Sequence, residues 1–231
     1  MGLTQKSLFG NAAIASKTKG DALFHEIRRA ILLRELQAGE SLTEPNIKRE
    51  FNCSQGTVRE ALMRLQEEGL VQRRGYHGTT VTRSTLAEGV QMAEIRIQLE
   101  MEGARHAIDK LSGGNIAEIE EYLRQMDHAA ETNDAYALSE LDRNFHLTLF
   151  RHSGLAALEP ILTRCMLHMH LQTFGNPRPG KRSIMPTEAH QPILIELKNR
   201  NAEAAANALC DHIKHTIGLW SPNLKSAMDA R

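Results

Sequence analysis

An ordered run of short segments, from residue 42 to residue 82, most restricts what this chain can fold into. Thr43 can cap a short helix, and Ser54 can cap a second helix after a compact turn. The apolar stripe of the second helix consists of Val58, Ala61, Leu62 and Leu65. Residues 70–73 and 79–82 are typical of two short strands around a tip that contains glycine. Helix, turn, helix and hairpin in this order predict a winged helix-turn-helix domain.

Such a domain has a defined use for its second helix and its wing. The N-terminus of the second helix enters the major groove of DNA, and the wing lies along a phosphate backbone or a minor groove. The candidate contacts at that N-terminus are Ser54, Gln55, Gly56, Thr57 and Arg59. Gln and Arg side chains can read adenine and guanine edges through paired hydrogen bonds. The candidate phosphate contacts are Lys48 and Arg49 on the supporting helix and Arg73, Arg74 and Gly75 on the wing. The alternative is that Arg59 and Arg64 are solvated helix charges.

The rest of the chain shows helical periodicity and no strand pattern. Aromatic residues make up only 4% of the chain, and hydrophobic residues make up 41%, which is enough for a sizeable core. One helix is expected at residues 21–35, before the winged region. Later helices are expected at 85–110, with a break near Gln91–Met92 as one option, and at 115–131, 134–152, 155–174, 187–199 and 202–219. The expected fold class is mainly α: a winged helix-turn-helix followed by an antiparallel all-α bundle of about six helices.

The charge distribution supports two domains. The net charge is zero, but residues 1–83 hold 13 Lys and Arg against 9 Asp and Glu, and residues 84–231 hold 15 against 19. A basic module joined to an acidic one is typical of a DNA-binding domain with a regulatory domain. The expected organisation is a flexible tail at 1–19, the winged domain at 20–83, a helical effector- and metal-binding domain at 84–221, and a flexible tail at 222–231.

Some protein classes are excluded by composition. Cys53, Cys165 and Cys210 are too few and too scattered for a disulfide scaffold, which indicates a reducing cytoplasm. No apolar run approaches the ~20 residues that a membrane span needs, and the N-terminus lacks the apolar region of a signal peptide. We therefore expect a cytoplasmic protein with no membrane partner.

The winged region contains a distinctive set of segments: Ser54-Gln55-Gly56-Thr57-Val58-Arg59-Glu60-Ala61-Leu62, then Leu65, Glu68-Gly69-Leu70-Val71 and Arg74-Gly75, and upstream Ala38-Gly39-Glu40-Ser41-Leu42-Thr43-Glu44. With these segments it resembles the DNA-binding domain of GntR-family bacterial transcription regulators. It implies binding to a double-stranded DNA operator. The family usually has Arg in place of Gln55 and often a polar or charged residue in place of Pro45, so no operator sequence is implied. One recognition helix covers only a few base pairs, which predicts a homodimer on two half-sites.

Histidines in the helical part suggest a metal site. Asp142 and His146 are four residues apart and share one helix face, and His190 and His212 lie on later expected helices. Three imidazoles and a carboxylate inside a bundle would suit a divalent transition metal such as zinc or nickel. The residues alone do not decide which of the 11 histidines take part, and His168 and His170 are equal candidates.

The helical part contains a second pattern: Arg96, Leu99, Glu100, Ala104 and Arg105, then Asp142, Phe145, His146 and Leu149, then His190 and His212. With this pattern it resembles the ligand-binding domain of the FadR-like branch of the GntR family, of FCD type and nearest the VanR-like subgroup. The resemblance implies that Asp142 and the three histidines of this pattern hold a divalent metal, and that the effector is a small organic or sugar acid. It also implies that Arg96 faces the cavity and pairs with an effector carboxylate. A structural salt bridge is the alternative for Arg96.

These observations together predict a metabolite-responsive transcription regulator, with repression as the expected mode, and not an enzyme. A metal-dependent hydrolase fused to a DNA-binding domain is one alternative, since three His and an Asp with an open position can activate water. An architectural DNA-binding protein whose bundle only dimerises is another.

Overall fold

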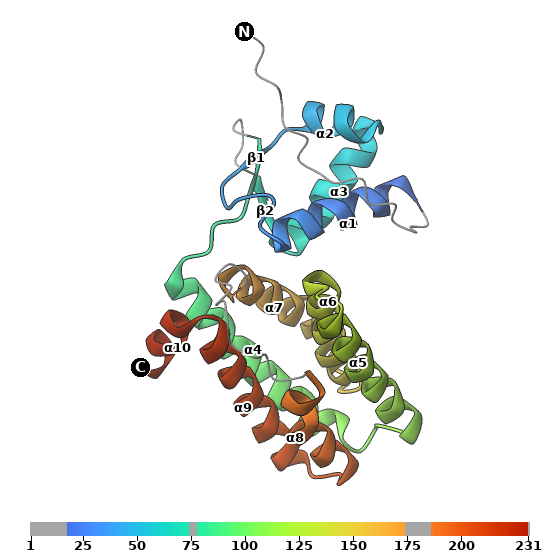
Figure 1. Cartoon of the computed structure of the whole chain (residues 1–231), viewed down its shortest axis with the longest axis vertical. Coiled ribbons are helices and arrows are strands. Elements are labelled where there is room, and N and C mark those ends of the chain that lie inside the picture. Colours follow the sequence, from blue (N-terminus) through green and yellow to red (C-terminus); the bar gives the residue numbers. More distant parts are fainter. Residues whose placement is uncertain (1–17, 74–77, 174–185, 231) are drawn as a thin grey trace. The chain divides into compact units, whose positions relative to one another are not determined.

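Figure 1 shows the computed structural model, which describes residues 18–73, 78–173 and 186–230. The chain divides between Ser84 and Thr85 into two units, one residue beyond the expected boundary. No helix in the described ranges is both long and apolar enough to cross a membrane.

The N-terminal unit is a winged helix-turn-helix, as predicted. Its elements are α1 (Lys19–Leu32), β1 (Ser41–Leu42), α2 (Glu44–Phe51), α3 (Gln55–Glu67), β2 (Val71–Arg73) and β3 (Thr79–Val81). The strands form one antiparallel sheet in the order β1-β3-β2, in which Ser41 lies opposite Thr80. Strand β1 was not expected, because two residues are too short to show alternation and become a strand only by pairing with β3.

The two expected helix caps differ from each other in the structure. Ser54 caps α3 as predicted, since its Oγ accepts a hydrogen bond from the Thr57 N–H at 3.1 Å. Thr43 occupies the N-cap position of α2, but its side chain makes no capping hydrogen bond. Pro45 has no N–H to offer in the first turn, and the Asn46 N–H donates to the Thr43 carbonyl oxygen at 3.1 Å instead.

Helices α1 and α3 pack against each other and supply much of the core of this unit. The buried residues include Leu23, Ile27 and Ile31 on α1 and Val58, Ala61 and Leu65 on α3. Helix α1 ends at Leu32 rather than at the expected residue 35, because Arg34 adopts a left-handed backbone conformation with φ 60°. The packing leaves the first turn of α3 exposed at Gln55 and Gly56.

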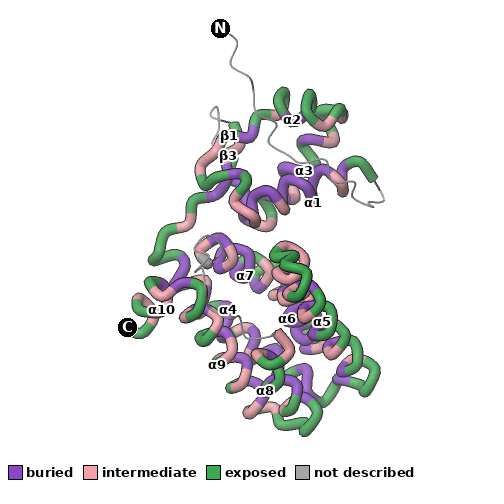
Figure 2. The backbone as a smooth tube through the Cα atoms, in the orientation of Figure 1, coloured by how far each residue is buried: buried purple, intermediate pink, exposed green. Residues whose placement is uncertain are grey.

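The C-terminal unit is an all-α bundle, as predicted. Its elements are α4 (Leu86–Ala107), α5 (Gly113–Glu131), α6 (Ala135–Arg151), a short 3-10 turn (Ala156–Leu158), α7 (Glu159–Thr173), α8 (Pro186–Lys198), α9 (Ala202–Trp220) and α10 (Pro222–Asp229). No strand occurs among the residues described in this unit. Within the bundle the buried residues lie on the faces that the helices turn toward one another (Figure 2).

Helix α4 is central to this bundle and packs on α6, α7, α9 and α10. The break considered near Gln91–Met92 is absent, and α4 is continuous there because Val90 and Ala93 are buried on its inner face. Further along α4, a side chain at Gly103 would collide with the Phe150 ring of α6. The glycine therefore lets α4 and α6 approach closely, one turn away from the site described below.

The expectation of a flexible tail at 222–231 was wrong for most of that segment. Residues Pro222–Asp229 form helix α10, with Pro222 in the first turn, where its missing N–H leaves no partner unsatisfied. Leu224 is fully buried in a cluster that contains Val90 and Ile217. An eight-residue helix has too few apolar positions for its buried face to be recognised from sequence alone.

Candidate functional site

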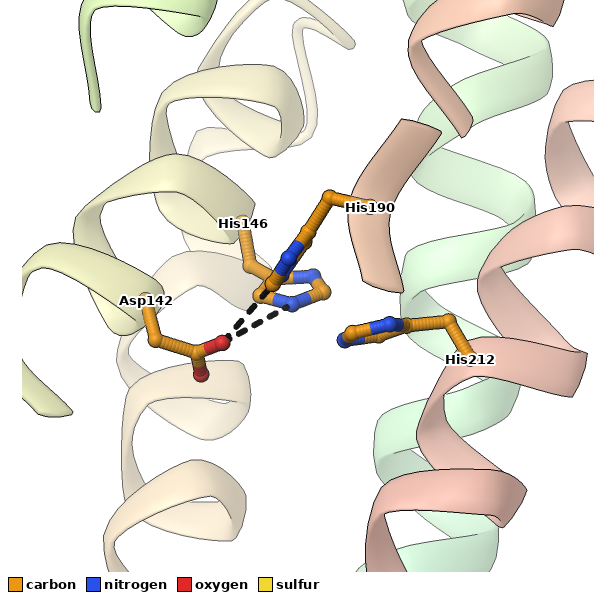
Figure 3. A group of neighbouring side chains, drawn as sticks. All are labelled: Asp142, His146, His190 and His212. Carbon is orange, nitrogen blue, oxygen red and sulfur yellow. Dashed lines mark ion pairs between the residues drawn. The ribbon is translucent and has the colours of Figure 1, made fainter. Parts of the chain in front are cut away.

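Four polar side chains converge inside the C-terminal bundle, as Figure 3 shows. Asp142 and His146 project from α6, one turn apart, while His190 comes from α8 and His212 from α9. Their potential ligand atoms all lie within 4.8 Å of one another. The structure thus brings together the quartet that the sequence suggested. His168 and His170, the alternative candidates on α7, do not belong to this group.

The three imidazoles of the quartet are oriented by hydrogen bonds at Nδ1. The acceptors are the Glu100 Oε2 atom at 2.5 Å from His146, the Pro186 carbonyl at 2.7 Å from His190, and the Ala189 carbonyl at 3.2 Å from His212. Each of these oxygens requires the hydrogen to be on Nδ1, so a neutral ring has its lone pair on Nε2. The second and third acceptors lie on α8, which therefore orients two of the rings.

The Nε2 atoms at the centre lack suitable partners within the described structure. Those of His146 and His190 are buried without a hydrogen bond. The nearest charged atom is Asp142 Oδ1, at 3.2 Å from the Nε2 of His190 and 4.0 Å from that of His146. With each imidazole hydrogen on Nδ1, the Nε2 lone pairs face one another and the lone pairs of the Asp142 carboxylate. Buried polar atoms without a hydrogen-bond partner lower the stability of the fold. A cation would satisfy them all, and three imidazoles with one carboxylate form a donor set that zinc and nickel accept.

The protonation of the quartet also suits a cation. Burial tends to raise the pKa of Asp142, but the neighbouring His190 and His146 side chains hold it well below its usual value. Burial, together with the neighbouring His190 and His146 side chains, lowers the pKa of His212 well below its usual value. Near neutral pH the Asp142 side chain is therefore a carboxylate and the His212 side chain a neutral imidazole, the forms that bind metal.

Arg96 makes the salt bridge that was the alternative to an effector contact. Its Nε donates to Glu100 Oε1 at 2.6 Å, and both side chains are buried. Burial tends to raise the pKa of Glu100, but its interactions with His146 and Arg96 outweigh this effect and lower the pKa to about 2. A contact between Arg96 and an effector stays a prediction. Sequence reasoning assigned no role to Glu100; the only local signal was its i,i+4 spacing from Arg96.

The candidate DNA contacts lie on the exposed side of the helix-turn-helix where the structure describes them. Exposed positions include Lys48 and Arg49 on α2, Ser54 before α3, Gln55, Gly56 and Arg59 on α3, and Arg73 on β2. Thr57 is half-buried, and its hydroxyl lies 2.9 Å from the Ser54 hydroxyl. Arg74 and Gly75, the candidates at the wing tip, lie outside the described residues.

Glu44 is a residue of this surface that sequence reasoning missed. Its Oε2 accepts hydrogen bonds from Gln55 Nε2 at 3.1 Å and from Arg59 Nε at 3.0 Å. One carboxylate thus orients both candidate base-reading side chains. Arg64, in contrast, pairs with Asp21 at 2.7 Å and stacks on the Phe24 ring, so it has a structural role within the domain.

Comparisons with known proteins agree with both units. The model of the gntR family of bacterial regulatory proteins matches residues 19–81, and the FCD domain model matches residues 91–215. The HTH-type transcriptional regulator YdhC of Bacillus subtilis (strain 168) is 25% identical over 203 residues, which cover 84% of this chain and 90% of that protein. The HTH-type transcriptional repressor RspR of Escherichia coli (strain K12) is 28% identical over 196 residues, which cover 83% and 84%. The solved structure of E. coli McbR/YncC has the same fold, with a TM-score of 0.72, 19% identity and coverage of 90% of this chain and 99% of that one.

Proposed function

Because this chain belongs to the GntR family of bacterial transcription regulators and carries an FCD domain, we propose that it is a repressor controlled by a divalent metal and a small carboxylate. Its relatives are transcription regulators rather than enzymes, so the metal-dependent hydrolase alternative is set aside. RspR is named a repressor, which favours repression over activation for this chain. The VanR-like subgroup remains part of the proposal, suggested by the resemblance alone.

The observation that carries the metal part of the proposal is the set of inward-facing Nε2 atoms beside Asp142. The residues that would hold the ion are Asp142, His146, His190 and His212. Among the described residues, these four bring their ligand atoms close enough together to share one ion. A bundle that served only for dimerisation would gain nothing from burying unsatisfied imidazole nitrogens, so the architectural alternative is disfavoured. Zinc and nickel are the ions that best fit the donors.

The effector proposal rests on charge. A divalent ion bound by three neutral imidazoles and one carboxylate keeps a positive charge and can offer open positions to an anion. A small organic or sugar acid is therefore the proposed effector class. Arg96 lies near the quartet, and its charge helps to lower the pKa of Asp142, so it adds positive potential at the same place.

The quartet also suggests how binding could affect the rest of the bundle. Its members come from α6, α8 and α9, so occupancy of the site would tie three helices together. An effector changes DNA affinity only if it binds two arrangements of the protein with different affinities. We infer that bundle packing is the property in which these arrangements differ.

On DNA, the proposed assembly is a homodimer. The exposed first turn of α3 can contact only a few base pairs, and two copies are needed to recognise an operator with useful specificity. Light scattering of the free protein and of its DNA complex tests this part. A single protein molecule bound to each operator would contradict it.

The test of the whole proposal combines metal analysis with ligand screening. Protein purified without chelator or affinity tag should contain a transition metal, and metal-loaded protein should be stabilised by some small organic or sugar acids in a thermal-shift screen. His212→Ala should lose the metal and the response, whereas His215→Ala, an exposed position on the same helix, should keep both. Protein without any transition metal, together with an unchanged acid response in His212→Ala, would refute the proposal.

A further inference from the structure

We propose that Glu100 is a positioning residue of the metal centre, which holds His146 as an Nε2 ligand and, with Arg96 as counter-charge, makes it the strongest of the three imidazole donors. This inference rests on the metal binding proposed above. It goes beyond that proposal because Glu100 lies on α4, a helix that supplies none of the four candidate ligands.

Both carboxylate oxygens of Glu100 have partners inside the bundle. Its Oε2 lies 2.5 Å from His146 Nδ1, and its Oε1 lies 2.6 Å from Arg96 Nε. The exposed fraction of the side chain is only 2% for Glu100 and 0% for His146. Both oxygens are thus used, one toward the ligand and one toward the arginine. A carboxylate buried this completely needs such partners, because an unpaired charge in the interior is strongly unfavourable.

The partner of His146 differs in kind from the partners of the other two rings. His190 and His212 donate from Nδ1 to neutral backbone carbonyls, whereas His146 donates to a charged carboxylate. A hydrogen bond to an ionised acceptor is shorter and stronger than one to a neutral acceptor. It also raises the basicity of the opposite nitrogen, which strengthens a metal bond at Nε2. His146 is therefore distinguished from its two neighbours by electrostatics.

Arg96 completes the arrangement as a counter-charge. It neutralises Glu100 inside the bundle, and the two residues lie one turn apart on α4, which keeps the pair together without help from other helices. Arg96 also reaches the Met169 sulfur on α7, with 3.9 Å between its Nη1 and Sδ. The orientation of His146 thus depends on the placement of α4 against α6 and α7. The candidate metal centre therefore includes residues of α4, the first helix of the C-terminal unit.

Zinc affinity of purified, metal-free protein tests the inference, measured by competition with a chromophoric chelator. Glu100→Gln should weaken zinc binding by about 10- to 100-fold, the range found when a carboxylate partner of a metal-bound histidine is removed. Glu102→Gln is the matched control, because it removes an exposed carboxylate from the same helix and should leave the affinity unchanged. An affinity in folded Glu100→Gln that equals the wild-type value would overturn the inference.

Two further measurements cover the case in which Glu100→Gln does not fold because Arg96 is left unpaired. The double variant Arg96→Met/Glu100→Gln removes both buried charges, and it should show the same loss of zinc affinity.

In the wild type, nitrogen NMR of ¹⁵N-histidine-labelled, zinc-loaded protein should show His146 bound through Nε2 with a proton retained on Nδ1. Zinc bound through Nδ1 would overturn the inference. Wild-type protein that binds no zinc or nickel at all would overturn the proposed metal function as well, so the two failures are distinguishable.

Discussion

Arg59 shows how a single residue on the helix-turn-helix can be tested for base recognition. Its side chain is 61% exposed, and Glu44 orients it through Nε, which leaves the rest of the guanidinium free to meet a guanine edge. Arg59→Ala should weaken binding to a selected operator by about 1–3 kcal/mol. The variant should bind random DNA almost as well as the wild type does. Fluorescence anisotropy with both duplexes measures the difference.

Arg73 provides the contrast for that experiment. It lies exposed on β2 of the wing, where a phosphate contact is expected. Arg73→Ala should weaken binding to operator and random DNA alike, and should lower the salt dependence of the affinity by about one unit of slope. Equal losses on both duplexes for Arg59→Ala would instead assign Arg59 to a phosphate.

Glu26 is a buried residue whose charge is expected to lower the free energy of unfolding in a pH-dependent way. It is 4% exposed on α1, and neither of its carboxylate oxygens has a hydrogen bond among the described residues. Burial raises its pKa above the ordinary 4.5 despite the charge of Arg29. Well below that ordinary value the carboxyl is neutral in both the folded and the unfolded chain, so the residue does not destabilise the fold through its charge. The destabilisation by the buried charge reaches its full size only above the folded-state pKa.

Glu26→Gln should therefore raise the free energy of unfolding at neutral pH by on the order of 1 kcal/mol, with the gain shrinking as the pH approaches about 4.5. Urea unfolding at several pH values measures this difference. Glu67→Gln, which changes an exposed carboxylate on α3, is the control and should have little effect. A gain that is the same at all pH values would show that the Glu26 charge is not its source.

At the scale of elements, the N-terminus of α8 is held by a residue from another helix. The Thr187 N–H donates to Asp127 Oδ1 on α5 at 2.9 Å, and the Thr187 hydroxyl donates to Oδ2. This contact fixes the turn of α8 in which the Pro186 carbonyl orients His190. Asp127 thus acts as a tertiary helix cap beside the candidate metal centre.

Asp127→Ala should lower the free energy of unfolding by about 1 kcal/mol, as loss of a helix cap does, and should also weaken metal binding. Ser112→Ala is the matched control, because it removes the cap of α5, which supplies no ligand. Chemical denaturation and chelator competition on both variants give the two values. If both variants lost stability and neither lost metal affinity, the start of α8 would have no part in placing His190.

At the scale of the whole molecule, the two units have separate cores and should respond differently to metal removal. A ligand that binds only the folded protein at 100 times its Kd stabilises it by about 2.7 kcal/mol. A chelator should therefore lower the unfolding temperature of the bundle and abolish the response to acids, while the winged domain stays folded and binds random DNA. Calorimetry and DNA-binding assays before and after chelation measure this, and restoring zinc should reverse it. Loss of random-DNA binding after chelation would contradict independent units.

The sequence by itself determined the features that depend on local chemistry. Periodic apolar residues, the Ser54 cap and the hairpin were enough to predict the winged domain and the helical bundle, because helix periodicity and capping act within a few residues. The i,i+4 spacing of Asp142 and His146 likewise placed two candidate ligands on one face. The choice of His190 and His212 over His168 and His170 came from a family resemblance, since spacing could not decide between them.

Only the tertiary structure decided the features that join distant parts of the chain. Glu100 and His146 are 46 residues apart, so their hydrogen bond exists only because α4 and α6 pack closely. Strand β1 and helix α10 are too short for a periodic pattern, and each is stabilised by an element far away in the sequence. The orientation of each imidazole could not be predicted from the sequence either, because it is set by the oxygen atom that the folded chain brings to Nδ1. Side-chain spacing shows which residues share a face, but burial and long-range hydrogen bonds decide what each of them can bind.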